Sequence, residues 1–600
     1  MRLALLTTLV WSVTGNDEQC RDLMARSDTE FKPIRVRPIY DSMFGSESAQ
    51  SYVTESLMPA IISWIERAIK VRRNLAGVEQ RPLRDAFNPA CGGSTQIAGY
   101  LAENGDNADL LVSVKLLPLD GLAGMAWVCF TDDCGRPTYT AVVLNSFKVD
   151  DAVTGKEGAR EKLESTLLHE MFHTLGFLHA HFAEFRNRQT MERLDPVVRA
   201  PIKYLCEERE DGSFSVRWDV RGREALGADT FNWPGNIVRA INARGLKAED
   251  CRCPVDPNRV YTNADIEYCM RHPNHCAIAV TSPKVVEKAR EYYGCDDIEG
   301  LELENSLPKC SELLQPHWKM RTLKAELMTW LSFDTRSWVS PMTLALLEDS
   351  GWYEVDYNMA AASIPTGSYG YKAGCEFAIG KCMNNGRPVD DKIFCLPSDA
   401  GRNRCSLDAT SVTSCNSPTI EQEGNATWRR RGTQTRRTFL PSYSYGIGRN
   451  WGLYGMDFCP VYDTKTTCMF GDSGVNSRCL ETQDGQALCM PVQCSADRSR
   501  YEIPGVGVCG EEGQSLLIRR GKHGSLDNSQ VVCRDPAVVC ADWNLVHFAS
   551  HSAMRTIPAA LGREPGPVGQ ITHSLPSGRK SGTIQQSMLI SLLITILHVV

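Results

Sequence analysis

The sequence contains no block of basic residues, and its overall charge is mildly negative. Its 600 residues include 65 Lys and Arg against 72 Asp and Glu, a formal net charge of −7. Nucleic-acid binding needs clustered Lys and Arg, so that class of function has no support and no nucleic-acid partner is expected. The apolar runs at residues 3–13 and 588–600 fall short of the ~20 residues that a membrane-spanning helix needs.

The cysteines lack the spacing of zinc fingers. There are 24 of them, and outside one helical segment they do not alternate with histidines. Cys251 and Cys253 form a lone pair without a matching second pair. This usage predicts disulfides formed in an oxidising compartment. A set of structural zinc sites is the alternative.

One short stretch carries the clearest chemical signal. Residues 169–173 read His-Glu-Met-Phe-His, the H-E-x-x-H pattern in which two histidines four residues apart share one face of a helix. Apolar residues recur at i, i+3, i+4 and i+7 and therefore predict a helix, namely Leu168, Met171, Phe172 and Leu175. Gly176 follows and can take the positive φ that ends a helix.

This spacing predicts a site for one catalytic zinc ion. A tetrahedral zinc ion can accept a nitrogen from both His169 and His173. Glu170 lies between them, where it can accept a proton from a water molecule that zinc has made acidic. The expected reaction is attack of that water on a peptide carbonyl, with Glu170 as general base. A helix with two surface histidines is the alternative, because the five-residue motif also arises by chance.

The remaining patterns predict an α+β fold. A helix is expected at residues 59–71, and strands are expected at residues 110–117 and 141–144. A later helix should start at Ser282 and Pro283 and end at Gly294. A short apolar helix should open at Ser340–Pro341 and close at Gly351.

The chain changes character after residue 375. Thirteen cysteines lie between Cys375 and Cys540, with frequent Gly, Pro, Asn and Asp and no long helical period. This composition indicates a disulfide-stapled, mainly β domain. With the rest of the chain, it suggests a signal peptide at 1–15, an N-terminal segment at 16–50, a domain with the H-E-x-x-H helix at 51–179, a mixed central domain at 180–370, the cysteine-rich domain at 371–545, a linker at 546–586 and an apolar tail at 587–600.

With these pieces in place, the chain resembles the leishmanolysin family of metzincin zinc metallopeptidases. The first matching motif is the segment 169–177, and the similarity as a whole covers roughly residues 35–545. Its later motifs follow in the family's order, at Ala289–Cys295, His317–Arg321, Glu326–Met328, Leu344–Tyr353 and Gly374–Phe377. The resemblance implies a secreted or cell-surface endopeptidase, monomeric, that cleaves proteins and peptides. Its catalytic domain would be metzincin-type, a twisted sheet with the active-site helix.

The third zinc ligand has two candidates. His179 completes the common metzincin pattern H-E-x-x-H-x-x-G-x-x-H. His317 instead fits the leishmanolysin arrangement, in which an insertion separates Gly176 from the third histidine. The resemblance favours His317, because Met328 follows eleven residues later and would form the hydrophobic floor of the site. Four protein ligands would leave no open position for water, so only one of the two histidines should serve.

The resemblance has two departures from the family pattern. The insertion between His173 and His317 is long and rich in cysteine, and the region before the catalytic domain is short for a pro-segment. Cys20 is the one cysteine placed to cap a zinc ion there, and a disulfide or no role at all is expected for it. Gly124–Val128 would be the edge strand that pairs with substrate, or else an ordinary strand with Trp127 in the core.

The two ends of the chain predict passage through the secretory pathway. Residues 1–15 have the pattern of a short signal peptide, and Asn425 begins the sequon Asn-Ala-Thr. Small residues near 577–582, a polar spacer and the apolar tail have the pattern of a signal for a glycosylphosphatidylinositol anchor. A soluble secreted protein is the alternative. For function, the alternative to an active peptidase is a catalytically silent adhesion or receptor-binding surface protein on the same scaffold.

Overall fold

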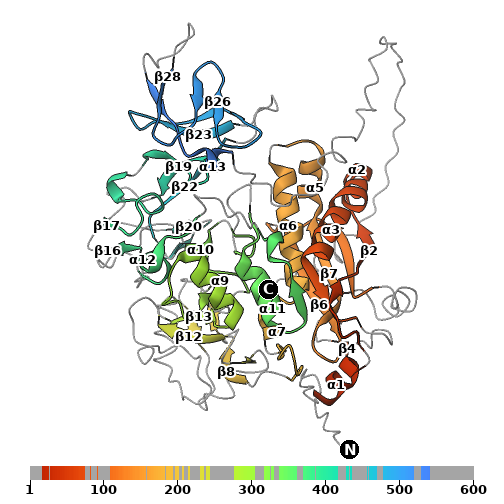
Figure 1. Cartoon of the computed structure of the whole chain (residues 1–600). Helices are drawn as coiled ribbons and strands as arrows, with labels where there is room; N and C mark the ends of the chain where they lie inside the picture. The colour runs from red at the N-terminus through yellow and green to blue at the C-terminus, as the bar shows by residue number, and fades with distance from the viewer. Residues whose placement is uncertain are drawn as a thin grey trace, which may run out of the picture. The chain divides into compact units, whose positions relative to one another are not determined.

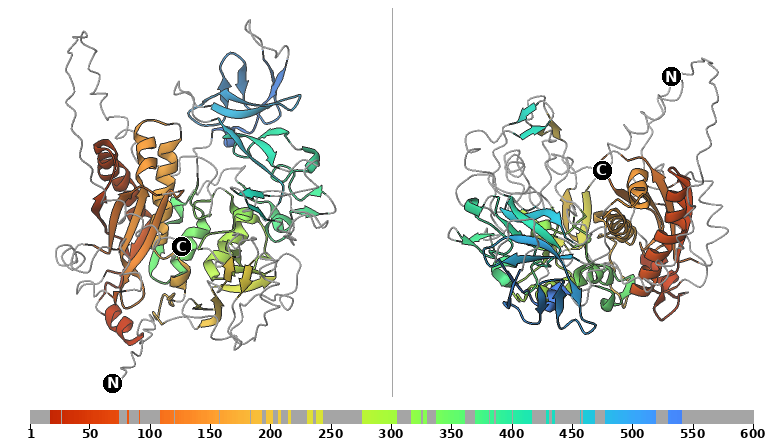
Figure 2. Two further views of the ribbon diagram at one scale, coloured as in Figure 1. Left: turned by 180° about the vertical axis from the view of Figure 1, so that it is seen from behind. Right: turned by 90° about the horizontal axis from the view of Figure 1, so that it is seen from above.

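The computed structural model (Figures 1 and 2) describes the chain between residues 17 and 540 with interruptions. The segments predicted to be a signal peptide, a linker and an apolar tail lie outside the described residues, as does Asn425. The described residues are 17–25, 27–73, 81–82, 91, 108–119, 121–156, 158–182, 184–192, 276–304, 316–324, 326–329, 337–360, 369–380, 382–384, 387–399, 401–416, 456, 459–468, 477–518 and 529–540, with the short strands 196–201, 206–208, 214–216, 230–234, 238–242, 428–430 and 433–435.

A five-stranded sheet forms the core of the N-terminal part, in the order β2-β5-β7-β6-β4. The strands β2, β5 and β7 run parallel, whereas β6 is antiparallel to β7 and to β4. Their bounds are Val36–Met43 for β2, Arg81–Pro82 for β4, Leu110–Leu117 for β5, Gly124–Thr131 for β6 and Pro137–Asn145 for β7. Almost every residue of β5 and β7 is buried, as expected for central strands made of continuous Val and Leu runs.

Helices α3 (Met58–Ala68), α5 (Ser146–Val153) and α6 (Ala159–Thr174) accompany this sheet. Helix α6 packs against β6, β7, α3 and α5, and Figure 1 shows it beside the sheet. The rings of Trp64 in α3 and Phe172 in α6 meet edge to face with centroids 5.9 Å apart. The apolar stripe predicted for the H-E-x-x-H helix is therefore confirmed as its buried face.

The predicted helix at 59–71 is wrong in its last three residues. Ile69–Val71 form strand β3, which pairs with β1 (Lys32–Pro33) on one side and β15 (Tyr353–Val355) on the other. Two β-branched residues and backbone partners on both edges favour a strand there. The helical periodicity of the sequence continues through residues 69–71. Their conformation, however, depends on pairing with a strand nearly 300 residues away, and a local sequence pattern carries no information about that strand.

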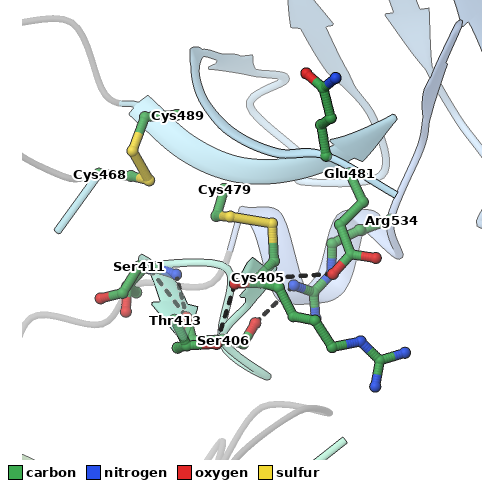
Figure 3. Close-up of a disulfide and its surroundings, with 12 residues drawn as sticks. Cys405, Ser406, Ser411, Thr413, Cys468, Cys479, Glu481, Cys489 and Arg534 are labelled. Carbon is green, nitrogen blue, oxygen red and sulfur yellow. Dashed lines mark hydrogen bonds between the residues drawn. A yellow bond between two sulfur atoms is a disulfide. The ribbon is translucent and has the colours of Figure 1, made fainter. Parts of the chain in front are cut away.

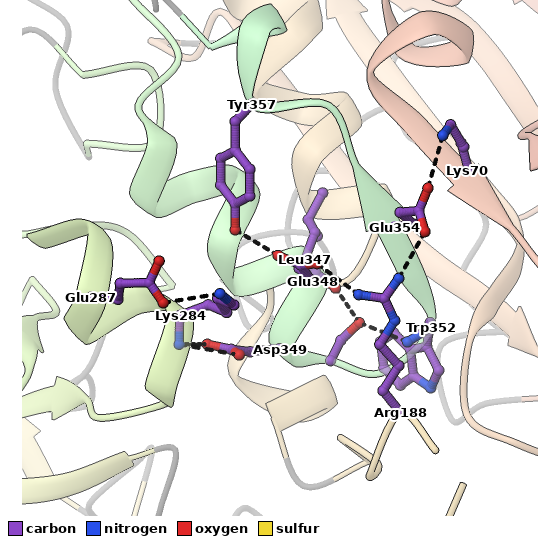
Figure 4. A network of polar contacts seen from close by, with 11 residues as sticks. Lys70, Arg188, Lys284, Glu287, Leu347, Glu348, Asp349, Trp352, Glu354 and Tyr357 are labelled. Carbon is purple, nitrogen blue, oxygen red and sulfur yellow. Dashed lines mark hydrogen bonds and ion pairs between the residues drawn. The ribbon is translucent and has the colours of Figure 1, made fainter. Parts of the chain in front are cut away.

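A polar network joins β3 and β15 to helix α11 (Pro341–Asp349), as Figure 4 shows. Arg188 donates to Glu348 at 2.7 Å and to Glu354 at 3.0 Å. Lys70 donates to the other oxygen of Glu354 at 2.8 Å, and the Tyr357 hydroxyl donates to Glu348. The network connects three segments that are far apart in the sequence.

Helix α9 (Pro283–Tyr293) packs against α11 and has the predicted bounds, with Gly294 at φ +68° after its last turn. The residue that caps this helix differs from the one that the sequence predicts. Ser282 makes no capping hydrogen bond to the helix; instead Asp349 of α11 accepts the N–H groups of Lys284 and Val285 at 3.0 and 3.1 Å. Burial raises the pKa of Asp349 to about 6, so this carboxyl group ties the two helices together at a desolvation cost.

Short antiparallel strands dominate the described part of the cysteine-rich region, which also contains the short helices α12 (Gly374–Ala378) and α13 (Pro536–Val539). Strands β18 (Asn403–Cys405), β19 (Ser411–Asn416) and β22 (Val461–Thr467) form one sheet. A four-stranded sheet has the order β24-β23-β29-β28, with bounds Ala487–Pro491, Ser477–Thr482, Gln530–Val532 and Ser515–Leu517. Cys405–Cys479 links the two sheets, and Arg534 donates to the carbonyls of Ser406 and Leu407 beside it (Figure 3).

The disulfide prediction is confirmed for the cysteines whose side chains the structure describes, all of which are paired. The pairs are Cys20–Cys134, Cys91–Cys129, Cys295–Cys375, Cys382–Cys459, Cys395–Cys415, Cys405–Cys479, Cys468–Cys489, Cys494–Cys540 and Cys509–Cys533. The fold is thus a mixed α and β structure with many disulfides. Within the described ranges, no helix combines the length and apolar character needed to cross a bilayer.

Candidate metal centre

His169 and His173 lie in the last two turns of α6, and their imidazole rings meet edge to face with centroids 4.6 Å apart. Their four-residue spacing places both rings on the same side of the helix, as the sequence pattern predicts. His317 comes from the segment just before α10 (Met320–Leu323) and stacks on His169 with centroids 5.1 Å apart. The fold therefore brings together three histidines from two segments separated by more than 140 residues.

The three Nε2 atoms form a small triangle. The distance between His169 and His173 is 3.0 Å, and His317 lies 3.2 Å from each of them. Donor atoms of an ideal tetrahedral zinc site, with bonds of ~2.1 Å, are roughly 3.4 Å apart. Among the residues that the structure describes, this is the one group of three or more His, Cys, Asp or Glu side chains that could hold a metal ion.

Two backbone carbonyls fix the tautomers of the histidines in α6. His169 Nδ1 lies 2.6 Å from the Leu327 carbonyl oxygen, and His173 Nδ1 lies 2.8 Å from that of Phe177. A carbonyl oxygen only accepts, so each Nδ1 carries the proton and donates it. Each Nε2 then presents a lone pair toward the other histidine. Burial also lowers the pKa of His169 to about 4, which keeps this imidazole neutral.

This donor set fits a divalent cation such as zinc. Two lone pairs 3.0 Å apart repel each other when nothing positive lies between them, whereas a cation turns both into ligands. Hydrogen bonds from the far ring nitrogen to a backbone carbonyl are the usual support of metal-binding histidines. The residues therefore have the chemistry and the protonation state that zinc requires, and the spacing of their Nε2 atoms is within about 0.4 Å of the tetrahedral value.

Glu170 is buried, with 7% of its surface exposed. It packs against the start of β6: a Cβ atom built on Gly124 would lie only 3.0 Å from Glu170 Cγ and 3.1 Å from Oε1. Burial raises the pKa of Glu170 to about 8. The charge of a cation held by the neighbouring histidines would oppose this shift and favour the carboxylate.

The segment that carries Met328 lies against the segment that carries His317. Trp318 donates its backbone N–H to the Met328 carbonyl at 2.8 Å, and Trp318 and Thr329 form a parallel bridge. Met328 is fully buried. Its role as the hydrophobic floor of the site stays a prediction, supported by this proximity to His317.

The alternative ligand His179 belongs to the short helix α7 (His179–Phe182), and its side chain lies outside the described residues. Nearby His181 is buried beside the Trp352 ring, with centroids 6.3 Å apart. The third ligand thus remains a choice between His317, which the structure places at the other two histidines, and His179.

Cys20 does not have the role of a zinc cap in this structure. It lies in α1 (Asp17–Ala25) and forms a disulfide with Cys134, with 2.00 Å between the sulfur atoms. A disulfide sulfur has no thiolate to offer a metal. The expectation of a disulfide for Cys20 is confirmed.

Sequence reasoning missed the carbonyls of Phe177 and Leu327 and the close approach of Gly124 to Glu170. Only one of these had a local signal. Phe177 follows Gly176, whose φ of +111° turns the chain so that the next carbonyl can face back toward the helix. The other two contacts depend on segments far from residues 169–173 in the sequence, so the local pattern could not reveal them.

Replacing Gly176 by alanine should destabilise the protein. Alanine at this positive φ costs about 1–3 kcal/mol, and its Cβ would lie 2.9 Å from Trp352 Cζ3. Gly155→Ala is the matched control, because Gly155 also has a positive φ, +79°, with no atom within 4 Å of a built Cβ. Denaturant unfolding should show a larger loss for Gly176→Ala, and an equal or smaller loss would contradict the packing described.

Known proteins resemble this chain over much of its length. A sequence model of the leishmanolysin peptidase family matches residues 264–547, a range that contains His317 and Met328 but starts after α6. The leishmanolysin-like peptidase of Drosophila pseudoobscura pseudoobscura is 24% identical over 453 residues, which cover 67% of this chain and 59% of that protein.

Two further relatives have related names. The leishmanolysin-like peptidase of Caenorhabditis elegans is 22% identical over 448 residues, or 66% of this chain and 60% of that protein. The leishmanolysin of Leishmania major is 34% identical over 235 residues, or 38% of this chain and 33% of that protein. The chain therefore spans less than two thirds of the length of these relatives.

Proposed function

Because the chain belongs to the leishmanolysin family, we propose that it is a zinc-dependent endopeptidase that hydrolyses peptide bonds of proteins. The observation that carries the proposal is the triangle of Nε2 atoms of His169, His173 and His317, with Glu170 beside it. In this proposal the three imidazoles hold one zinc ion. When bound, zinc would supply Lewis acidity to a water molecule and to the carbonyl of the scissile bond.

Glu170 would move the proton in this reaction. Its carboxylate accepts a proton from the attacking water and then delivers it to the leaving amine, since the same group can act as base and acid in turn. Packing against Gly124 limits where the carboxylate can go. Its burial strengthens its electrostatic interactions with the reacting groups.

Substrate would bind along β6 in this proposal. Among the described strands, β4 pairs with β6 only at Phe130 and Thr131, beyond the stretch Gly124–Val128. The first four residues of β6 are partly exposed, so an extended peptide could add to this edge by backbone hydrogen bonds. Trp127 packs partly buried against a core cluster, which would anchor the strand.

Casein hydrolysis with and without a zinc chelator tests the function. The protein should hydrolyse casein, lose activity when zinc is removed by the chelator, and regain it when zinc is returned. Calcium returned at the same concentration is the control, because calcium prefers oxygen ligands and should not restore activity. Bound zinc without hydrolysis would contradict the proposal and favour the catalytically silent surface protein.

Gly124 gives a sharper test of the position of Glu170. Gly124→Ala should lower kcat by roughly 10-fold or more, because displacing a catalytic group by a fraction of an ångström to 1 Å can cost up to 10²-fold. Zinc content should stay unchanged. Gly121→Ala is the control: it lies three residues earlier, and a Cβ there would have no atom within 4 Å. Equal kcat values for both variants would show that the close contact at Gly124 does not position Glu170.

The wider organisation is part of the same proposal. The five-stranded sheet and α6 would form a metzincin-type catalytic domain at 51–179, followed by the central domain at 180–370 and the cysteine-rich domain at 371–545. The protein would act as a monomer in the secretory pathway or at the cell surface. Disulfides in the described residues support an oxidising compartment; the signal peptide and lipid anchor are proposed from sequence.

A further inference from the structure

Glu326 is a fully buried carboxyl group in the segment of the chain that connects α10 to α11. It accepts the N–H of Met328 at 2.5 Å, the N–H of Ser340 at 3.1 Å and the hydroxyl of Thr343 at 2.5 Å. Burial raises the pKa of Glu326 to about 7, and these hydrogen bonds oppose the rise. Keeping such a group buried costs free energy. The segments that its hydrogen bonds connect therefore indicate what the carboxyl group does.

One connection leads to His169. Glu326 and Met328 flank Leu327, whose carbonyl accepts the Nδ1 proton of His169 at 2.6 Å. The Leu327 N–H is itself bound to the Trp338 carbonyl at 2.8 Å. With the Met328 N–H held by the Glu326 carboxyl group, the peptide groups on both sides of Leu327 are fixed. The carbonyl that orients His169 therefore has little freedom to rotate.

A second connection leads to His317. Thr343 Oγ1 donates to Glu326 Oε1 and accepts the indole N–H of Trp318 at 2.8 Å. Trp318 directly follows His317, and its backbone N–H is bound to the Met328 carbonyl. Glu326 is thus connected to the segment of His317 in two ways. One is the Thr343 hydroxyl group, and the other is the backbone of Met328.

The same tryptophan also touches the support of His173. The Trp318 and Phe177 rings meet edge to face with centroids 5.0 Å apart. The Phe177 carbonyl is the group that accepts the Nδ1 proton of His173. All three histidines therefore depend on backbone or rings that lie within three contacts of Glu326.

We propose that Glu326 is a positioning residue for the metal centre, which holds the Leu327 carbonyl and the Trp318 indole so that the three histidines converge. This rests on the proposed function, because it assumes that the histidines bind zinc. Glu326 touches neither metal nor substrate. It acts by fixing the partners of the ligands, a kind of support whose loss typically weakens metal affinity 10–100-fold.

Glu326→Gln tests the proposal with little change in volume. An amide has one acceptor oxygen, so its NH2 group must face the N–H of Met328 or the donors at Ser340 and Thr343. Asp349→Asn is the matched control, because Asp349 is also a largely buried carboxyl group that accepts backbone N–H groups, at the start of α9. A purely structural role would affect unfolding similarly in both and leave the metal site alone.

The measurement is the dissociation constant for zinc, by competition with a chromophoric chelator on the full chain, together with the visible spectrum of the cobalt-substituted protein. Glu326→Gln should bind zinc about 10–100-fold more weakly and show an altered cobalt spectrum, while Asp349→Asn stays within about twofold of wild type. Zinc affinity and a cobalt spectrum equal to wild type in Glu326→Gln would overturn the proposal.

Thr343→Val keeps the test decisive if Glu326→Gln does not fold. Valine has nearly the shape of threonine but removes the hydroxyl between Glu326 and Trp318. It should also weaken zinc binding, and an unchanged zinc affinity would overturn the proposal. A wild-type chain that binds no zinc would instead overturn the proposed function, so the two failures give different results.

Discussion

Glu170→Ala should bind zinc and fold like the wild type but hydrolyse casein about 10²–10⁴-fold more slowly, the usual contribution of a positioned general base. The reason is that Glu170 is the buried carboxyl group packed beside Gly124 and next in sequence to a candidate zinc ligand. Single-turnover or steady-state rates on a defined peptide would give kcat, and metal analysis would give the zinc content.

Glu161→Gln is the control for this prediction. Glu161 lies in the first turn of α6, two turns before His169, so the substitution removes a carboxylate from the same helix without touching the site. Its kcat should remain close to that of wild type. A Glu170→Ala enzyme that works within a few-fold of wild type would exclude Glu170 as the general base.

His317→Ala should abolish hydrolysis and weaken zinc retention, because removing one of three imidazoles leaves only two protein ligands. In the structure, His317 Nε2 lies 3.2 Å from the Nε2 atoms of both His169 and His173. Zinc bound per chain after dialysis and hydrolysis of casein with zinc resupplied would measure the two effects separately.

His179→Ala is the internal control, since it tests the rival ligand. It should retain zinc and most of the activity if His317 is the third ligand. The reverse pattern, with His179→Ala inactive and His317→Ala active, would assign the third position to His179. A loss of activity in both variants with zinc retained only in His179→Ala would give His179 a role other than ligation.

The local parts of the site could be read from the sequence because local rules determine them. Four-residue spacing on a helix places His169 and His173 together, and a glycine at positive φ ends the helix at Gly176. The start of α11 at Ser340 and Pro341 also followed from capping preferences, and Ser340 accepts the Thr343 N–H at 3.0 Å. Each of these depends on residues within a single turn or two.

The parts that sequence could not supply depend on distant contacts. Asp349 takes the capping role expected of Ser282 because α11 packs against α9. The last residues of the helix predicted at 59–71 become β3 because β1 and β15 offer backbone partners. The pairing of Cys20 with Cys134 was one of very many possible connectivities. His317 was found only through the resemblance, since nothing local marks it as a ligand.

Anomalous diffraction at the zinc absorption edge, from crystals of the protein prepared with zinc, would test the central claim most directly. One peak should appear per chain, at bonding distance of ~2.1 Å from the Nε2 atoms of His169, His173 and His317. A peak bonded to His179 instead of His317, or the absence of a peak at the triangle of histidines in protein shown to contain zinc, would contradict the account.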